Sequence, residues 1–197
     1  MSRYCVLADL RDYLGFSGTL GQTQDGLLQN AINRAEGAID AYTRRTFVGT
    51  AGTAYYSRYF QDRVRNHALY IDQDLFSLTA LQNGDGQTIP TGSVWLEPRN
   101  VGPPYRIIRL KSSYVWVWNT DSDITISGTW GYGTVAPQDI QQATVRLAAF
   151  FFRQKDVGPI TDVAGFPEAG EVQIVSGIPN DVRYLLNPYR SRSGGAV

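Results

Sequence analysis

The sequence predicts an α+β fold, in which helices near both ends of the chain form a core and an antiparallel β region is inserted between them. Residues 25–46 and 137–155 repeat apolar residues at every third or fourth position, the period of an amphipathic helix. Between these two stretches, residues 55–131 contain short runs rich in Tyr, Trp, Val, Ile and Thr, separated by turn sequences such as QNGDG. We expect each run to form a strand, among them HALYI (67–71), LFSLTAL (75–81) and YVWVW (114–118). No segment between the runs is long enough for a crossover helix, so we expect the strands to pair antiparallel.

An N-terminal helix pair is expected first. Residues 6–14 (VLADLRDYL) are amphipathic and are followed by Gly15, a residue type that commonly closes a helix. Residues 25–46 form a longer helix, with Thr23 as a candidate N-cap. Its apolar stripe consists of Leu28, Ala31, Ile32, Ala35, Ala38, Ile39 and Tyr42. The small residues on it, Gly37 among them, would allow another helix to come close.

The third helix is expected over residues 137–155. Pro137 suits the first helical position, where the backbone N–H it lacks would have no partner. The apolar stripe consists of Ile140, Ala143, Leu147, Ala148 and Phe151. We therefore expect Ile39 and Leu147 to lie in one core, although the β region separates them in the sequence. The predicted division of the chain is a core over residues 1–156, followed by an extended loop and a C-terminal docking arm over 157–197.

The glycines at the end of the β region raise the question of phosphate binding. Gly128, Gly131 and Gly133 precede a helix, and a glycine-rich turn before a helix can hold a phosphate with its backbone N–H groups. Here Pro137 removes one of these groups, Asp139 adds a negative charge, and no Lys is near. We interpret the segment as a sharp corner in the chain.

The sequence offers no set of catalytic, metal-binding or cofactor-binding residues. Cys5 and His67 are the only residues of their types, so a zinc quartet or an internal disulfide cannot form. Two carboxylate pairs, Asp72 with Asp74 and Asp121 with Asp123, are two residues apart, but their surroundings read as strand ends or turns. We expect a protein that is not an enzyme and has no cofactor. An enzyme with an unrecognised site is the weakest alternative.

The charge and aromatic content favour contacts with other proteins. The formal net charge is zero, the N-terminus lacks the apolar run of a signal peptide, and no stretch approaches the length of a membrane span, so no membrane contact is expected. Of the 18 Lys and Arg residues, only Lys111 and Lys155 are Lys. This excess of Arg favours a protein with many interface contacts, because Arg is enriched in interfaces. A GC-rich genome would produce the same excess of Arg. The run YVWVW could place Tyr114, Trp116 and Trp118 on one sheet face, either in the core or against a partner.

Several segments taken in order resemble one known family. The end of the long helix (AIDAYTRRTF), the central β region, the run PPYRIIRL, and the segment ITISGTWGYGTVAPQDIQQATVRLAAFFFRQKD are together similar to the head–tail connector (adaptor) proteins of tailed bacteriophages. The resemblance spans residues 6–156. It implies a non-enzymatic virion protein that forms a ring, typically of twelve copies, beneath the portal of the DNA-filled head. The alternative is a non-viral β-rich module that binds a sugar or a peptide in a Trp- and Tyr-lined groove.

The resemblance also implies partners and a location. The partners are copies of the same chain, the portal protein, a downstream neck, stopper or tail protein, and the genomic DNA that passes through the channel. The location is the head–tail interface of a virion assembled in the host bacterial cytoplasm. Positive residues that cluster in this neutral chain are candidates for the DNA channel, and ion pairs to a neighbouring subunit are the alternative: Arg44, Arg45, Arg106, Arg109 and Lys111.

The C-terminal arm is the candidate portal-binding element. Its short helix-like run has apolar and aromatic residues at three- and four-residue spacing, which suits a helix that binds in a groove. The resemblance implies that connector subunits dock on the portal through this region. The alternative is that the arm folds back onto its own subunit. The residues expected to bind the portal are Val182, Arg183, Tyr184, Leu185, Leu186, Tyr189 and Arg190.

Overall fold

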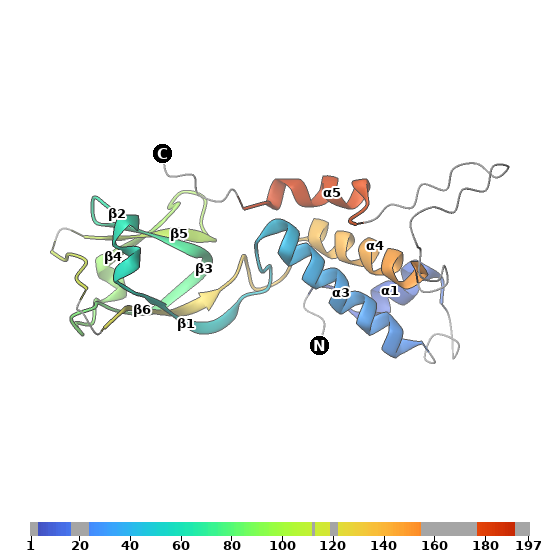
Figure 1. Ribbon diagram of the computed structural model, residues 1–197, viewed down its shortest axis with the longest axis horizontal. Helices are drawn as coiled ribbons and strands as arrows, with labels where there is room; N and C mark the ends of the chain where they lie inside the picture. The colour runs from blue at the N-terminus through green and yellow to red at the C-terminus, as the bar shows by residue number, and fades with distance from the viewer. Residues whose placement is uncertain (1–3, 17–23, 112, 119–121, 155–176, 192–197) are drawn as a thin grey trace. The chain divides into compact units, whose positions relative to one another are not determined.

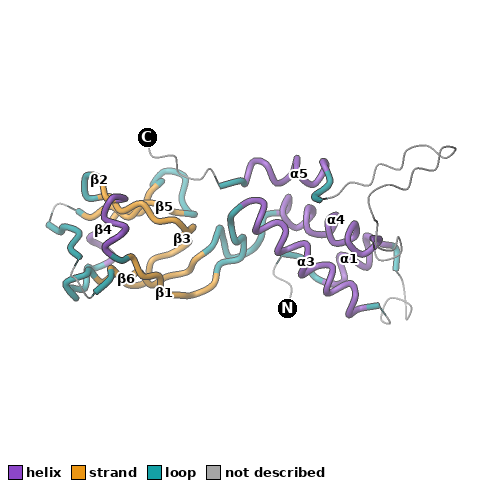
Figure 2. The backbone as a smooth tube through the Cα atoms, in the orientation of Figure 1, coloured by secondary structure: helices purple, strands orange, loops and turns teal. Residues whose placement is uncertain are grey.

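The fold was analysed in a computed structural model, which describes residues 4–16, 24–111, 113–118, 122–154 and 177–191 (Figures 1 and 2). Its contacts divide the chain into two compact units. The helical unit comprises Met1–Arg44 and Pro137–Val197, and the β unit comprises Arg45–Ala136. The predicted α+β class, with an inserted antiparallel β region, is confirmed. The predicted boundary between residues 156 and 157 stays a prediction, because it falls outside the described residues.

The helical unit is built on two long helices that lie side by side, α3 and α4 (Figure 1). Its helices are α1 (Leu7–Leu14), α3 (Asp25–Thr43), α4 (Gln138–Gln154), α5 (Asn180–Leu186) and the 3₁₀ turn η4 (Asn187–Tyr189). Helix α1 contacts both long helices. Fully buried residues on the predicted stripes meet here: Leu28, Ile32, Ala35, Ile39, Ile140, Ala143, Leu147 and Ala148. The expectation that helices distant in sequence share a core is therefore confirmed.

The helix ends differ by a few residues from the sequence-based expectation. The helix predicted over 25–46 ends at Thr43, because Arg44 adopts a left-handed conformation with φ of 55°. Its N–H donates to the Asp40 carbonyl oxygen at 2.8 Å, which closes the last turn. The first helix begins one residue late, at Leu7, and the third helix begins at Gln138. Thr23 and Lys155 lie outside the described residues.

The β unit contains one strongly curved antiparallel sheet. The strands are β1 (Thr50–Tyr56), β2 (Val64–Arg65), β3 (Ala68–Gln82), β4 (Val94–Glu97), β5 (Tyr105–Leu110) and β6 (Ile124–Trp130), with 3₁₀ turns η1 (Arg58–Arg63) and η2 (Thr91–Ser93). Over the described residues the order is β1-β6-β3-β5-β4, and β2 pairs with β3. The core inside the curve includes Leu69, Leu75, Leu81, Ile108, Ile124 and Ile126. Leucine and isoleucine side chains therefore fill most of the inner face, as expected for a sheet with one buried face.

Two of the predicted strands merge and one is absent. The runs at 67–71 and 75–81 are parts of the single strand β3, whose pairing with β5 and β6 shifts register at several points. The run at 114–118 is not a strand. Even so, Tyr114, Trp116 and Trp118 all pack against the core of the β unit. The expected common face is thus present, but an irregular segment supplies it.

The glycine-rich segment is a corner, as the sequence predicts. Gly131 has a φ of 145°, and a Cβ atom placed on it would lie 2.5 Å from the Gly49 Cα. Two segments of the chain run side by side here, since the Tyr132 N–H donates to the Thr46 carbonyl oxygen at 2.8 Å. The rings of Phe47 and Tyr132 also meet, with centroids 5.5 Å apart. The glycines are needed because two backbones approach closely.

Candidate functional site

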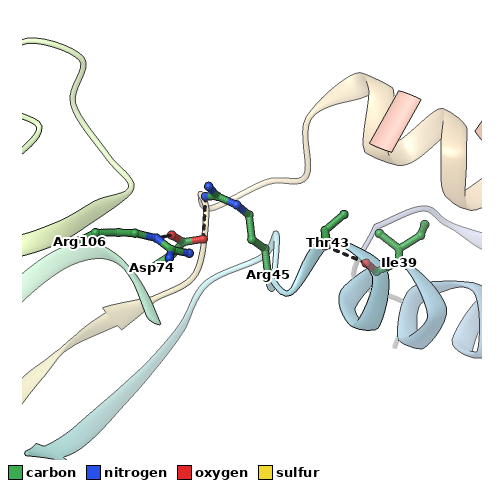
Figure 3. A network of polar contacts seen from close by, with 5 residues as sticks. All are labelled: Ile39, Thr43, Arg45, Asp74 and Arg106. Atoms are coloured by element: carbon green, nitrogen blue, oxygen red, sulfur yellow. Dashed lines mark hydrogen bonds and ion pairs between the residues drawn. The ribbon is translucent and has the colours of Figure 1, made fainter. Parts of the chain in front are cut away.

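The first candidate site is a buried carboxylate between two arginines (Figure 3). Asp74 lies within β3, and its side chain is 3% exposed. Its Oδ2 accepts from Arg45 Nη1 at 2.9 Å, and its Oδ1 accepts from Arg106 Nε at 2.7 Å. The Arg45 guanidinium also lies 5.5 Å from the centroid of the Tyr132 ring. Both arginines are thus held within the subunit, where two positive charges meet one negative charge.

Arg109, the third channel candidate, has its own acidic partner. Its Nε and Nη2 donate to the two carboxylate oxygens of Glu97, at 2.6 and 3.3 Å. The hydrogen bond from Arg109 is the largest of the effects that lower the pKa of Glu97. The third guanidinium donor, Nη1, bonds to the Asn66 carbonyl oxygen at 2.9 Å. This arginine fastens β5 to β4 and to the β2–β3 turn.

The last two channel candidates have different surroundings. The Lys111 ammonium donates to the Gly92 carbonyl oxygen and lies 5.8 Å from the Trp95 ring centroid. Arg44 is exposed at the end of α3, and it forms no ion pair with the residues that the structure describes. Three of the five candidates are therefore paired with acidic residues of the same chain, and within the described residues Arg44 and Lys111 are the two without such a partner. The role of all five in a channel stays a prediction.

The described part of the predicted portal-binding arm, residues 177–191, packs on its own subunit. Helix α5 buries Val182 and Leu186, which are 1% and 0% exposed, and it contacts α3 and α4. At the start of the helix, Asp181 pairs with Arg146 at 3.2 Å. Beyond its end, three hydrogen bonds hold the chain: Tyr42 donates to Asn187 at 2.7 Å, Tyr189 donates to Asp139 at 3.2 Å, and the Ser191 N–H donates to the Thr43 carbonyl oxygen at 2.8 Å. This is the fold-back alternative that the sequence left open. The apolar anchors expected to enter a portal groove instead hold the helix in place.

The outer face of α5 nevertheless presents residues suited to an interface. Tyr184 is 80% exposed, and Arg183 beside it is exposed as well. Arg190, just beyond the helix, lies over the Tyr42 ring at 5.3 Å. Tyr and Arg are enriched among residues that dominate binding energy at interfaces. Portal binding by this segment therefore stays a prediction. If it occurs, exposed residues such as Arg183 and Tyr184 make the contact, because Val182 and Leu186 are buried against the chain's own helices.

The tryptophans of residues 114–118 have structural partners. Trp116 Nε1 donates to the His67 carbonyl oxygen at 2.9 Å, and Trp118 Nε1 donates to the Tyr56 carbonyl oxygen at 3.1 Å. His67 Nδ1 lies 3.0 Å from the Tyr114 carbonyl oxygen. These contacts hold the irregular segment on the sheet, and both indoles are half-buried.

The remaining candidate groups show no catalytic arrangement in the described residues. Asp72 accepts from the Tyr56 hydroxyl at 2.8 Å, and burial raises the pKa of that hydroxyl above its usual value. Asp123 is exposed, and Asp121 lies outside the described residues. Burial, followed by the nearby Glu36 and Asp9, raises the pKa of the Cys5 thiol to about 12, so it is unreactive at neutral pH. Among the described residues, His, Cys, Asp and Glu form no group of three or more that could hold a metal ion.

In the described part of the chain, no helix combines the length and the apolar character that crossing a bilayer requires.

Comparison with solved structures finds the same fold in phage-like particles. A chain in the neck of an empty gene transfer agent (GTA) particle, computed with C6 symmetry, matches with a TM-score of 0.63 and 20% identity, over 96% of this chain and 91% of that chain. A chain in the virion of a native GTA particle matches with the same TM-score at 18% identity, and one in a native GTA neck computed with C12 symmetry has a TM-score of 0.61 at 18% identity. No protein-family model and no curated protein matches the chain. At these identities the similarity shows a shared fold.

Proposed function

We propose that this chain is a structural subunit of the neck of a phage or phage-like particle, in which copies of it form a ring beneath the portal. The observation that carries the proposal is the fold shared with chains from GTA necks, which covers 96% of this chain and therefore both of its units. The necks were computed with C6 and C12 symmetry, which is consistent with repeated copies around an axis. The C12 symmetry of the native GTA neck agrees with the ring of twelve copies that the sequence resemblance implies.

In this proposal the ring joins the DNA-filled head to the next neck or tail component and extends the DNA channel. The subunit acts through its surfaces and catalyses no reaction. Arg44 is the candidate for contact with DNA phosphates, since Arg45, Arg106 and Arg109 are paired with acidic residues of the same chain and the Lys111 ammonium is bonded to the Gly92 carbonyl oxygen. One positive residue per subunit would give a ring of charges that attracts DNA without holding it tightly.

The portal contact is assigned to the outer face of α5. The apolar side of this helix is fixed to α3 and α4 through Val182 and Leu186, so it is a rigid support. Tyr184 projects from the opposite side and Arg183 from the flank of the helix, and both are exposed, so a partner can cover them. A preformed helix loses less conformational entropy on binding than a free arm would, which favours this arrangement.

Paired substitutions test the assignment. The Arg183→Ala, Tyr184→Ala double variant changes two exposed side chains, so it should keep the wild-type melting temperature but fail to bind portal-containing heads in a co-sedimentation assay. Tyr13→Ala is a matched control, because Tyr13 is 53% exposed on α1 of the same unit. It should bind as the wild type does. Binding by the double variant at the wild-type level would rule out this face as the portal contact.

A further inference from the structure

Strand β1 is an uncharged edge of the sheet. It stands at the end of the strand order and, among the described strands, it pairs only with β6. Its sequence, TAGTAYY, contains no charged residue and no proline, and residues 50–53 and Tyr55 are exposed. Free edges in soluble proteins are usually shielded by charges, prolines or bulges, because unpaired backbone groups recruit strands from other chains. An edge without such protection is suited to pairing with another chain.

A groove lies beside this edge. It has a volume of about 390 Å³ and is lined by Thr50, residues 52–56, Asp72, Gln73 and Trp130. Trp130 Nε1 donates to the Gly52 carbonyl oxygen at 3.1 Å, which holds the indole against β1. Asp72 carries the only formal charge among the lining residues and is exposed. The groove is therefore mildly acidic, and it is lined by six of the seven residues of the edge.

The opposite end of the sheet offers a complementary edge. Strand β4 is last in the order and, in the described chain, pairs only with β5. Trp95, in the middle of β4, is 40% exposed. Two cations lie over its ring, Arg99 at 4.6 Å and Lys111 at 5.8 Å from the centroid. This edge thus brings an exposed aromatic residue and positive charge, which complement the acidic groove.

We propose that β4 of one copy of this chain adds to β1 of the next copy, so that the sheets of neighbouring subunits join through the groove. The inference rests on the proposed function, since it specifies how copies meet in the ring. The contact joins two different surfaces, and a head-to-tail contact of this kind can repeat around a ring. A contact between two β1 strands would use one surface twice and would stop at a dimer.

The first test changes the edge by one residue. Thr53→Lys places a charge on the exposed centre of β1. Thr53→Val replaces the hydroxyl, which lies 2.9 Å from the Ser127 hydroxyl, with a methyl group and adds no charge. Thr79→Lys is the matched control, because Thr79 is exposed on β3, away from either edge. All three variants should keep the wild-type melting temperature. If the new charge weakens each contact about tenfold, which is about 1.4 kcal/mol, the loss recurs at every contact around the ring. The fraction of rings in native mass spectrometry should therefore fall by much more than tenfold for Thr53→Lys, and it should be unchanged for the other two variants.

The second test locates the partner strand. A photo-crosslinking amino acid at position 53 of the full-length chain, irradiated in assembled rings, should link to residues 94–97 of another copy. Links between two β1 strands, or to other regions, would overturn the inference, and so would normal rings from Thr53→Lys. In those cases the rings themselves would still support the proposed neck function. If the wild-type chain forms no ring, both proposals fail together.

Discussion

Two adjacent leucines of α3 provide a sharp test of where the helical core lies. Leu28 is 0% exposed, whereas Leu27 next to it is 52% exposed. Leu28→Ala removes three buried carbon atoms and leaves a cavity between closely packed helices, which should lower the free energy of unfolding by about 3–5 kcal/mol. Leu27→Ala should change it by about 0.5 kcal/mol or less, because that side chain is largely in water in the folded state. Both variants have the same composition, so the comparison isolates burial.

The assay is urea denaturation followed by far-ultraviolet circular dichroism at a helical wavelength, which reports mainly on the helical unit. The free energy difference is taken from the transition midpoint and the slope of the denaturant dependence. A loss of less than about 1 kcal/mol for Leu28→Ala would show that this residue is not in a packed core. Equal losses for the two variants would refute the assignment of the inner and outer faces of α3.

Three further predictions concern the β unit and the exposed face of α3. Asp74→Asn removes the charge of the buried carboxylate between two half-buried arginines. It should lower the free energy of unfolding, measured by chemical denaturation, by on the order of 3 kcal/mol. Gly131→Ala should lower the free energy of unfolding by at least about 2 kcal/mol, since φ is 145° and the added Cβ would meet Gly49. Gly37→Ala, at an exposed helical position with open space around it, should raise the free energy of unfolding by up to about 1 kcal/mol. The pKa of Glu97 lies below its usual 4.5, so its pair with Arg109 stabilises the fold above that pH and is lost as the pH falls through the lowered value. Glu97→Gln should therefore lose less stability than the wild type between neutral pH and about pH 3, and identical pH profiles would contradict this.

The helical unit could be predicted well because local and long-range signals agree there. The apolar period of residues 25–46 matches the face that is buried, and Ile39 and Leu147 lie in the core as expected. The early end of α3 was missed because it depends on one left-handed residue, Arg44. Arg rarely adopts this conformation, and no Gly or Asn marks the position.

The sheet was harder to predict because β3 is irregular. Its register shifts between Tyr70 and Leu75, and again between Leu75 and Ser77. Each shift breaks the simple alternation of inward and outward residues, so Asp74 reads as a strand end although it is buried within the strand. The same shifts hide the continuity of the runs at 67–71 and 75–81.

Contacts between distant residues account for the other differences. Nothing near Arg45 or Arg106 in the sequence indicates that both bind Asp74, because Asp74 is 29 and 32 positions away from them in the chain. The sequence indicates only weakly that α5 packs on its own subunit. Val182 and Leu186 are four residues apart and form a single apolar stripe. That stripe is compatible with a partner protein or with the chain's own helices, and only the structure distinguishes the two.

The central claim is that copies of this chain assemble into a symmetric neck ring. Native mass spectrometry of the full-length protein, alone over a range of concentrations and together with the portal protein of its particle, measures this directly. We expect a single closed assembly whose mass corresponds to twelve copies, with a central channel visible in electron micrographs of the same sample. A protein that stays monomeric under both conditions, or that forms only dimers, would contradict it.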